Sequence, residues 1–269
     1  MSKEIWEYDL YKANVPFIID GTIVEYDISK ANISILMDAG CLSEELYAQL
    51  YNSNKMERQI SIGKLQGKNP NLSLALSEGL QNARKKFIEM NNFNTMNIID
   101  IRKDSISIYG TQQATQFQIS DHVSFRVAGN YTSLYRLGFI DIYYLYDVIT
   151  GQEIIDPRGL GKSKELHKDY MLDFLSELFY VARAWDGPKK ALELLKNFNE
   201  KYINRDLAIG FYREFNPQSM YKLNYSDFSS MYADMLLDAK HIKKDLDISF
   251  NANILRELVK YYSSVYFRK

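Results

Sequence analysis

The chain has 269 residues, of which 46% are hydrophobic and 25% are charged, and its formal net charge is −1. These values are typical of a folded protein with a sizeable core, and they exclude disorder over most of the length. The near-zero charge also excludes a globally basic nucleic-acid-binding protein, so a site of that kind would have to be local.

Cysteine, histidine and hydrophobicity exclude further classes. Cys41 is the single cysteine, so neither an intrachain disulfide nor a cysteine-based zinc cluster can form. The three histidines are scattered and lack the spacing of a histidine metal site. No apolar run approaches the roughly 18 residues of a membrane span, and the N-terminus lacks the apolar core of a signal peptide. We therefore expect a cytoplasmic protein without membrane contact.

The first part of the chain is predicted to place an acid between a strand and a helix. Asp20-Gly21 is a hairpin signal between the apolar run 17–19 and the β-branched run 23–26. This hairpin would put Asp27 at the end of its second strand. Residues 29–36 are predicted to turn and begin a helix, so the Asp27 carboxylate would stand on rigid backbone.

Two helices are predicted before the next strands. Ser43 precedes two glutamates, which is typical of a helix start because serine caps the helix and acids favour its first turn. Gly63, Gly67 and Pro70 indicate a loop, and residues 72–90 then show the apolar periodicity of a helix.

The segment 55–86 is locally basic, with seven Lys and Arg residues against two Glu. Arg84 and Lys85 are expected to project from the predicted helix. Such a basic edge is either a solvated surface or a binding site for phosphates.

The middle of the chain is rich in predicted strands, and the last part is mainly helical. Residues 96–101 and 105–109 are two β-rich runs around a tight turn, and further strands are expected across 115–149, with the β-rich part ending near residue 158. The order predicts an α+β chain, with a mixed or antiparallel sheet and packed helices in 1–158 and a mainly helical part in 159–269. In the second part we expect helices at 163–185, 189–202, 227–244 and 251–267, and a strand at 209–215.

Asp27 and Asp104 could carry the chemistry of nucleotidyl transfer. That reaction needs carboxylates that hold two divalent ions, and cations that bind the leaving phosphates. We expect the two acids to converge and hold Mg²⁺ or Mn²⁺, with Arg84 and Lys85 on the triphosphate. An Asp at a strand end also commonly caps the next helix, and Lys-Asp-Ser is an ordinary turn sequence, so a structural role remains the alternative. The alternatives for a third ligand are Asp20, Glu25 and Asp100.

Two short motifs resemble those of family B DNA polymerases. The sequence DISKANISI, residues 27–35, resembles motif A, Asp-x-x-Ser-Leu-Tyr-Pro-Ser-Ile, through Asp27, Ser34 and Ile35. The sequence RKDS, residues 102–105, resembles motif C, Asp-Thr-Asp-Ser, in its second half. In the second motif Asp104 and Ser105 match, and Arg102 replaces the first Asp.

The resemblance implies a palm-like domain in 1–158, with a basic helical insertion at about 42–93. The helical part, 159–269, would correspond to a thumb that grips duplex backbone. The implied activity is the addition of nucleotides to a 3′-hydroxyl, with a nucleoside triphosphate and a nucleic-acid primer and template as partners. The short spacing of the two acids, and the lack of a preceding exonuclease, indicate a reduced polymerase of viral or plasmid origin.

The resemblance also implies roles for individual residues. Asn32 stands where the family has the tyrosine that excludes ribose, so the sugar preference is open. Lys103 and Ser105 are expected to contact nucleic acid. Three strand residues are interpreted either as a template groove or as structural: Tyr109, Arg126 and Arg136.

Two hypotheses compete with the enzyme. In the first, the chain is a non-catalytic interaction protein, such as a phage accessory protein or inhibitor, whose tyrosine-rich surface binds a protein partner. In the second, Arg102 marks a degenerate palm that binds nucleic acid without catalysis. The separation of the Asp27 and Asp104 carboxylates discriminates between these hypotheses, because a shared pair of metal ions requires the two acids to be close together.

Overall fold

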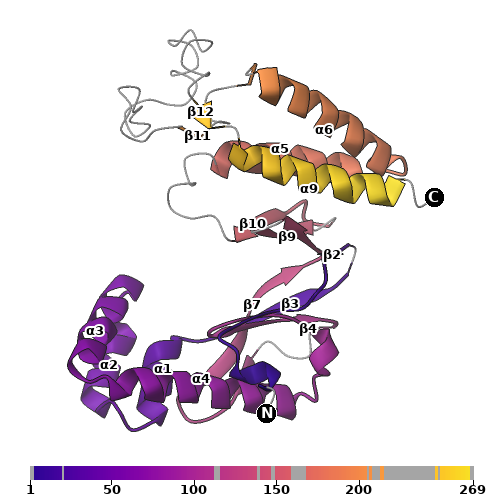
Figure 1. Cartoon of the computed structure of the whole chain (residues 1–269). Helices are drawn as coiled ribbons and strands as arrows, with labels where there is room; N and C mark the ends of the chain where they lie inside the picture. Colours follow the sequence, from indigo (N-terminus) through magenta and orange to yellow (C-terminus); the bar gives the residue numbers. More distant parts are fainter. Residues whose placement is uncertain are drawn as a thin grey trace. The chain divides into compact units, whose positions relative to one another are not determined.

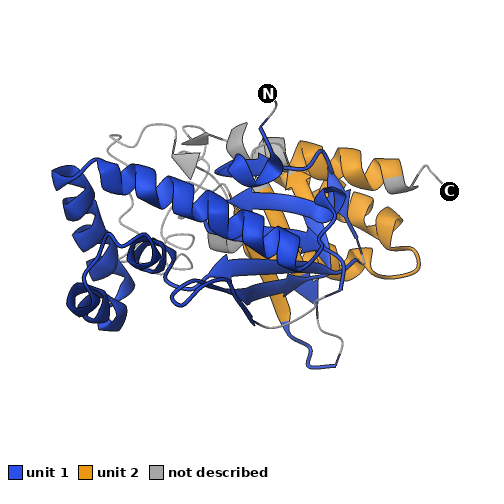
Figure 2. Ribbon diagram, turned by 90° about the horizontal axis from the view of Figure 1, so that it is seen from below, with its two compact units in different colours: residues 1–134, 145–152 blue, residues 135–144, 153–269 orange. Residues whose placement is uncertain are grey.

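A computed structural model of the chain describes residues 3–19, 21–111, 116–137, 140–146, 149–158, 168–204, 206–207, 213–214, 246–247 and 249–266. The chain forms two compact units, 1–134 with 145–152 and 135–144 with 153–269 (Figure 2). The units therefore differ from the division predicted after residue 158. The reason is aromatic packing, because Tyr135 and Tyr144 contact Phe179, at ring-centroid distances of 4.6 and 4.9 Å.

The first unit is built on a six-stranded antiparallel sheet with the strand order β1-β4-β5-β3-β7-β6. β3 lies near the middle, between β5 and β7, and is therefore hydrogen-bonded on both sides. The strands of this sheet are β1 (Leu10–Lys12), β3 (Ile23–Ile28), β4 (Ile98–Arg102), β5 (Ser105–Tyr109), β6 (Gln116–Gln118) and β7 (Ser124–Tyr131).

Along β3, apolar side chains point to one face of the sheet and acidic side chains point to the other. Val24, Tyr26 and Ile28 point to one face and join the main core, as the period of two along a strand requires. Glu25 and Asp27 point to the opposite face. Asp27 is only half-buried there, at the C-terminal end of the strand.

The core on the apolar face is largely aromatic. The Phe87 ring, from helix α4 (Asn71–Met90), stacks on Phe125 of β7 at 4.2 Å and lies 5.1 Å from Tyr26. Ile101 and Ile106 complete this contact from the β4–β5 hairpin. Burial of such side chains contributes about 1.5–3 kcal/mol each, so α4 is held firmly on this face of the sheet.

Four helices of the first unit lie together beside the sheet (Figure 1). They are α1 (Ala31–Asp38), α2 (Glu44–Asn52), α3 (Lys55–Lys68) and α4. The predicted start of α2 is confirmed, because the Ser43 hydroxyl accepts a hydrogen bond from the Leu46 amide at 3.3 Å. A second apolar cluster joins all four helices through Leu36, Leu50, Ile62 and Leu72.

The loop predicted around Gly63 and Gly67 is wrong, because α3 runs through both glycines. A capping box starts this helix: the Asn54 side chain accepts from the Glu57 amide at 2.9 Å, and the Glu57 carboxylate accepts from the Asn54 amide at 3.2 Å. Ile62 packs into the helical cluster and compensates for the low helix propensity of glycine. The two glycines lie on the exposed side.

The two hairpins predicted from sequence have different outcomes. β4 and β5 form the expected hairpin, with Arg102 opposite Ser105. The Asp20-Gly21 hairpin is wrong, because β2 (Phe17–Ile18) is not a neighbour of β3 in the six-stranded sheet. The Gly21 amide instead donates to the Thr132 carbonyl at 2.9 Å, and Asp20 lies outside the described residues. Two 3₁₀ helices, Ile5–Glu7 and Thr95–Asn97, precede β1 and β4.

The second unit combines strands with helices, and the chain passes from the first unit to the second within β8 (Ser133–Leu137). β8, β9 (Ile140–Tyr146) and β10 (Glu153–Arg158) are neighbours in this order in a second sheet. Helix α6 packs between α5 and α9, and Phe198 stacks on Phe174 at 3.8 Å. The helices are α5 (Lys168–Ala182), α6 (Gly187–Asn204) and α9 (Ser249–Tyr266).

The chain is therefore an α+β protein with a mainly helical C-terminal part, as predicted. Three of the four helices expected there are present in the described residues, and the fourth, at 227–244, lies outside them. Of the expected strand at 209–215, the structure describes only β11 (Arg213–Glu214), which pairs with β12 (Leu246–Asp247). No helix in the described parts of the chain is long and apolar enough to span a membrane.

Candidate functional site

The two acids singled out from the sequence lie at the same end of neighbouring strands. Asp27 occupies the end of β3 and is paired with Ser105, the first residue of β5. Asp104 directly precedes Ser105 in the β4–β5 turn. The Ile28 amide donates a hydrogen bond to the Asp104 carbonyl at 3.0 Å. The residue that follows Asp27 is therefore hydrogen-bonded to the main chain of Asp104. The predicted convergence of the two residues is present.

Asp27 and Asp104 line one pocket of about 340 Å³. The pocket opens between the end of β3, the start of α1 and the first turns of α3. It combines the two carboxylates with a surplus of cations, which suits an anionic ligand that also carries a metal ion. These cations are Lys30, Lys55, Arg58 and Arg126.

The electrostatics of the pocket couple the two acids. Burial, together with the negative charges of Asp104 and Glu25, raises the pKa of Asp27 from its ordinary value of 3.8 to about 6. Arg126 and Lys55 oppose this rise. Asp27 and Asp104 therefore repel each other, and a cation bound between them would relieve the repulsion.

The donor set fits Mg²⁺ or Mn²⁺ shared with a phosphate ligand. The described residues contain no group of three His, Cys, Asp or Glu side chains that could enclose a metal ion. Mg²⁺ commonly takes one or two carboxylates and completes its shell with water and substrate phosphates, which the Asp27–Asp104 pair allows. Of the third-ligand candidates, Asp100 accepts from Arg102, Glu25 is nearly buried in β3, and Asp20 is not described.

Arg102, at the position of the missing first acid of motif C, is held within its own strand. Its Nε and Nη2 atoms both lie 3.0 Å from Oδ2 of the buried Asp100. The two residues project from the same face of β4, because they are two positions apart. The positive charge of Arg102 is thus balanced by Asp100, and neither residue lines the pocket of Asp27 and Asp104.

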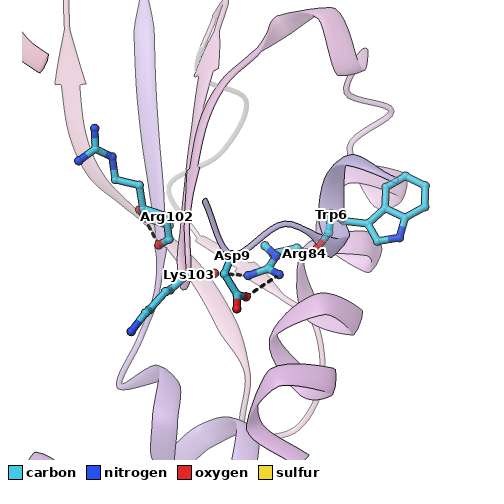
Figure 3. Close-up of polar contacts among 6 residues, drawn as sticks. Trp6, Asp9, Arg84, Arg102 and Lys103 are labelled. Atoms are coloured by element: carbon cyan, nitrogen blue, oxygen red, sulfur yellow. Dashed lines mark hydrogen bonds and ion pairs between the residues drawn. The ribbon is translucent and has the colours of Figure 1, made fainter. Parts of the chain in front are cut away.

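Arg84 and Lys85 lie away from this pocket, contrary to the sequence prediction. Arg84 is fully buried, and its guanidinium reaches from α4 to Trp6, Asp9 and Lys103 (Figure 3). Lys85 is exposed on the next position of the helix and forms a surface ion pair with Glu89 at 3.9 Å. Neither residue therefore lines the pocket of Asp27 and Asp104.

The cations that do line the pocket come mainly from α3. Lys55 and Arg58 stand on the first turns of this helix and lie in the same pocket wall. Sequence reasoning missed them because the segment after them was read as a loop. The Asn54–Glu57 capping box was the signal that could have revealed the helix. Arg126, interpreted from sequence as a template contact or a structural residue, is paired with Asp27 across β3 and β7.

Lys30, which lines the same pocket, has an unusual backbone conformation. Lys30 adopts a left-handed backbone (φ 48°) immediately before α1. Its ammonium group donates to the Tyr51 carbonyl at 2.7 Å and lies 3.1 Å from the centroid of the Tyr51 ring. This contact fixes the tyrosine of α2 at the pocket. Asn32, on the first turn of α1, is exposed and lines the same pocket.

The other residues named from sequence lie around the site or outside it. Lys103 is exposed in the β4–β5 turn with a left-handed backbone (φ 49°), and Ser105 donates to the Arg102 carbonyl at 3.3 Å. Both flank Asp104 without lining the pocket. Tyr109 is half-exposed at the far end of β5, and Arg136 belongs to the second unit.

Comparison with known proteins decides the family. A family model described as Bacteriophage PBS1 gene 130 protein matches residues 1–264. The chain belongs to this family. The match to the gene 130 family covers almost the whole chain, so the predicted viral setting is confirmed at the level of a phage protein family. That description names no activity, and no curated protein matches the chain.

Proposed function

We propose that the chain is a metal-dependent nucleotidyltransferase that adds nucleotides to a 3′-hydroxyl. One observation carries this proposal: Asp27 and Asp104 share a pocket beside a group of Lys and Arg side chains, and the negative charge of Asp104 contributes to the raised pKa of Asp27. Two neighbouring carboxylates facing several cations are the arrangement that a metal-bound triphosphate requires.

Each pocket residue has a role in the proposed reaction. Asp27 and Asp104 would hold two Mg²⁺ or Mn²⁺ ions in the pocket that they share. Lys55 and Arg58 would bind the β- and γ-phosphates, and so orient the α-phosphate toward the acids. Arg126, across β7, would balance the charge of Asp27 when the pocket is empty. When bound, the divalent ions supply Lewis-acid stabilisation of the charge on the reacting phosphate.

The covalent change is a displacement at phosphorus. The oxygen of a primer 3′-hydroxyl forms a bond to the α-phosphate, the bond from that phosphorus to the β-phosphate oxygen breaks, and pyrophosphate leaves. The hydroxyl proton passes to solvent. The substrates are a nucleoside triphosphate and a nucleic-acid primer, with a template as a further partner, and Lys103 and Ser105 are proposed to contact the nucleic acid beside Asp104.

A second candidate is nucleic-acid binding without catalysis. The observation that favours it is the Arg102–Asp100 ion pair, which places a balanced charge where the polymerase motif has its first acid. The pocket cations would then bind phosphate groups of a nucleic acid and release counterions on binding.

A primer-extension assay tests the proposal. The chain is incubated with a labelled primer–template, each dNTP or NTP, and Mg²⁺ or Mn²⁺. Extension of the primer supports nucleotidyl transfer, and incorporation of only the complementary nucleotide shows that it is template-directed. Binding of the primer–template without extension favours the second candidate, and neither binding nor extension contradicts both.

A further inference from the structure

Arg84 is a fully buried arginine that lies outside the pocket of Asp27 and Asp104. None of its side-chain surface is exposed, although a buried guanidinium is costly unless it is well hydrogen-bonded. Its three donor groups are used in three directions. Nε donates to the Trp6 carbonyl at 2.9 Å, Nη2 faces Asp9 Oδ1 at 3.4 Å, and Nη1 donates to the Lys103 carbonyl.

These contacts meet at the turn that presents Asp104. Figure 3 shows Arg84 reaching from α4 to Asp9 and to the main chain at Lys103. Lys103 is in the left-handed region (φ 49°), a conformation that costs a non-glycine residue roughly 1 kcal/mol or more and persists only when its surroundings hold it. The Lys103 amide donates to the Asp9 carbonyl at 2.8 Å, so Arg84 and Asp9 together bind both main-chain polar groups of Lys103.

The peptide groups on both sides of Asp104 are consequently fixed. The carbonyl of Lys103, which precedes Asp104, accepts from Arg84. The carbonyl of Asp104 itself accepts from the Ile28 amide at 3.0 Å. With both flanking peptides held, the direction of the Asp104 side chain from the backbone is set toward the end of β3, where Asp27 stands. Burial lowers the pKa of Arg84, and the negative charges of Asp9 and Asp104 partly oppose this shift.

We propose that Arg84 is a positioning residue for Asp104: its guanidinium holds the Lys103 carbonyl, and thereby fixes the turn in the geometry that lets Asp104 and Asp27 bind a divalent ion together. This inference rests on the proposed metal site. Arg84 would thus contribute to the metal site by positioning Asp104 and not by contacting the triphosphate.

Affinity for Mn²⁺ alone, measured by electron paramagnetic resonance during titration of the full chain, tests the inference without an activity assay. Arg84→Lys keeps the charge but replaces the three separately placed guanidinium nitrogens with a single ammonium nitrogen. Loss of a residue that orients a metal ligand typically weakens binding about 10–100-fold, and we expect a loss of that size. Lys86→Met, which removes a charge from the exposed side of the same helix, should leave the Mn²⁺ affinity unchanged.

A second variant covers the case in which Arg84→Lys does not fold. Asp9→Ala removes the ionic partner of Arg84 from an exposed position, and should weaken Mn²⁺ binding in a chain whose circular dichroism is unchanged. Wild-type Mn²⁺ affinity in folded Arg84→Lys overturns the inference, as does wild-type affinity in Asp9→Ala where Arg84→Lys is unfolded. If the unaltered chain does not bind Mn²⁺, or if Asp104→Asn leaves its Mn²⁺ affinity unchanged, both the proposed function and this inference are contradicted.

Discussion

The amide of Ile28 donates a hydrogen bond to the carbonyl of Asp104, at 3.0 Å. This bond joins the end of β3 to the β4–β5 turn, although the two segments are far apart in the sequence. It places Asp27, the residue before Ile28, next to the turn acid, and the pKa of Asp27 responds to the charge of Asp104.

The first prediction concerns pH and the stability of the metal-free chain. The pKa of Asp27 is about 6 in the folded chain and near its ordinary value of 3.8 in the unfolded chain. Between these values the folded state binds more protons, so the contribution of Asp27 to stability is present at low pH and is lost as the pH rises through about 6. Asp27→Asn removes this loss, because asparagine does not ionise.

Thermal unfolding in a chelator measures the effect. Because Asp27 is partly exposed, we reduce the expected effect of its ionisation on stability to roughly 1 kcal/mol. As the pH rises from 4 to 7.5, the Tm of Asp27→Asn should therefore increase by about 2–4 °C relative to that of wild type. A Tm difference that stays constant across this pH range would show that Asp27 is not destabilised by ionisation.

The second prediction concerns the cations of α3. Lys55→Met and Arg58→Met should each raise the KM for the nucleoside triphosphate about 10-fold, since a charge-assisted hydrogen bond contributes roughly 1.5–3 kcal/mol. Steady-state primer extension gives KM and kcat separately. Lys64→Met, an exposed change on the same helix outside the pocket, is the matched control. Equal KM values in all three variants would show that Lys55 and Arg58 of α3 do not bind the triphosphate.

The third prediction concerns the sugar. Asn32 is exposed at the pocket, and a larger side chain there would crowd a ligand. If Asn32 stands beside the sugar, Asn32→Tyr should raise the preference for dNTP over NTP about 10-fold, because the ring would collide with the 2′-hydroxyl. The ratio of kcat/KM for the two substrates measures this preference, with Asn32→Ala as the control for loss of the amide. An unchanged ratio in Asn32→Tyr would place the sugar elsewhere.

The fourth prediction compares two helical glycines. A Cβ on Gly79 of α4 would lie 2.3 Å from Ile35 Cγ2, whereas a Cβ on Gly63 of α3 would meet nothing within 4 Å. Gly79→Ala should therefore destabilise the chain by about 1–3 kcal/mol through overpacking. Gly63→Ala should stabilise it by about 0.5–1 kcal/mol, because alanine favours the helix. If urea denaturation showed that both substitutions stabilise the chain, or that both destabilise it, the packing of α1 on α4 would be contradicted.

Local sequence patterns predicted the parts of the fold that depend on neighbours in the chain. The β4–β5 hairpin follows from alternation around Lys103-Asp104, and α2 follows from the Ser43 cap. The two glycines of α3 indicated a loop, whereas the Asn54–Glu57 capping box, a local pattern not used in that prediction, marks the start of the helix. The pairing of Asp27 with Arg126 depends on strand order in the sheet, which local patterns do not specify.

Arg84 shows why the candidate site was only partly predicted. Arg84 follows Leu80 by four positions and precedes Phe87 by three, so it lies on the apolar stripe of α4 that faces the sheet. Its charge led to the expectation of an exposed phosphate ligand, although its position in the helix indicated burial. The partners that make burial tolerable, at Trp6 and Asp9, come from a segment more than 70 positions away.

The most direct test of the central claim is the rate of nucleotide incorporation by wild type, Asp27→Asn and Asp104→Asn, under one set of conditions with Mg²⁺ and again with Mn²⁺. Circular dichroism and Tm establish that all three chains are folded. The account predicts metal-dependent incorporation by wild type, and incorporation by both variants that falls to the background measured without protein. Wild-type rates in either folded variant would contradict it.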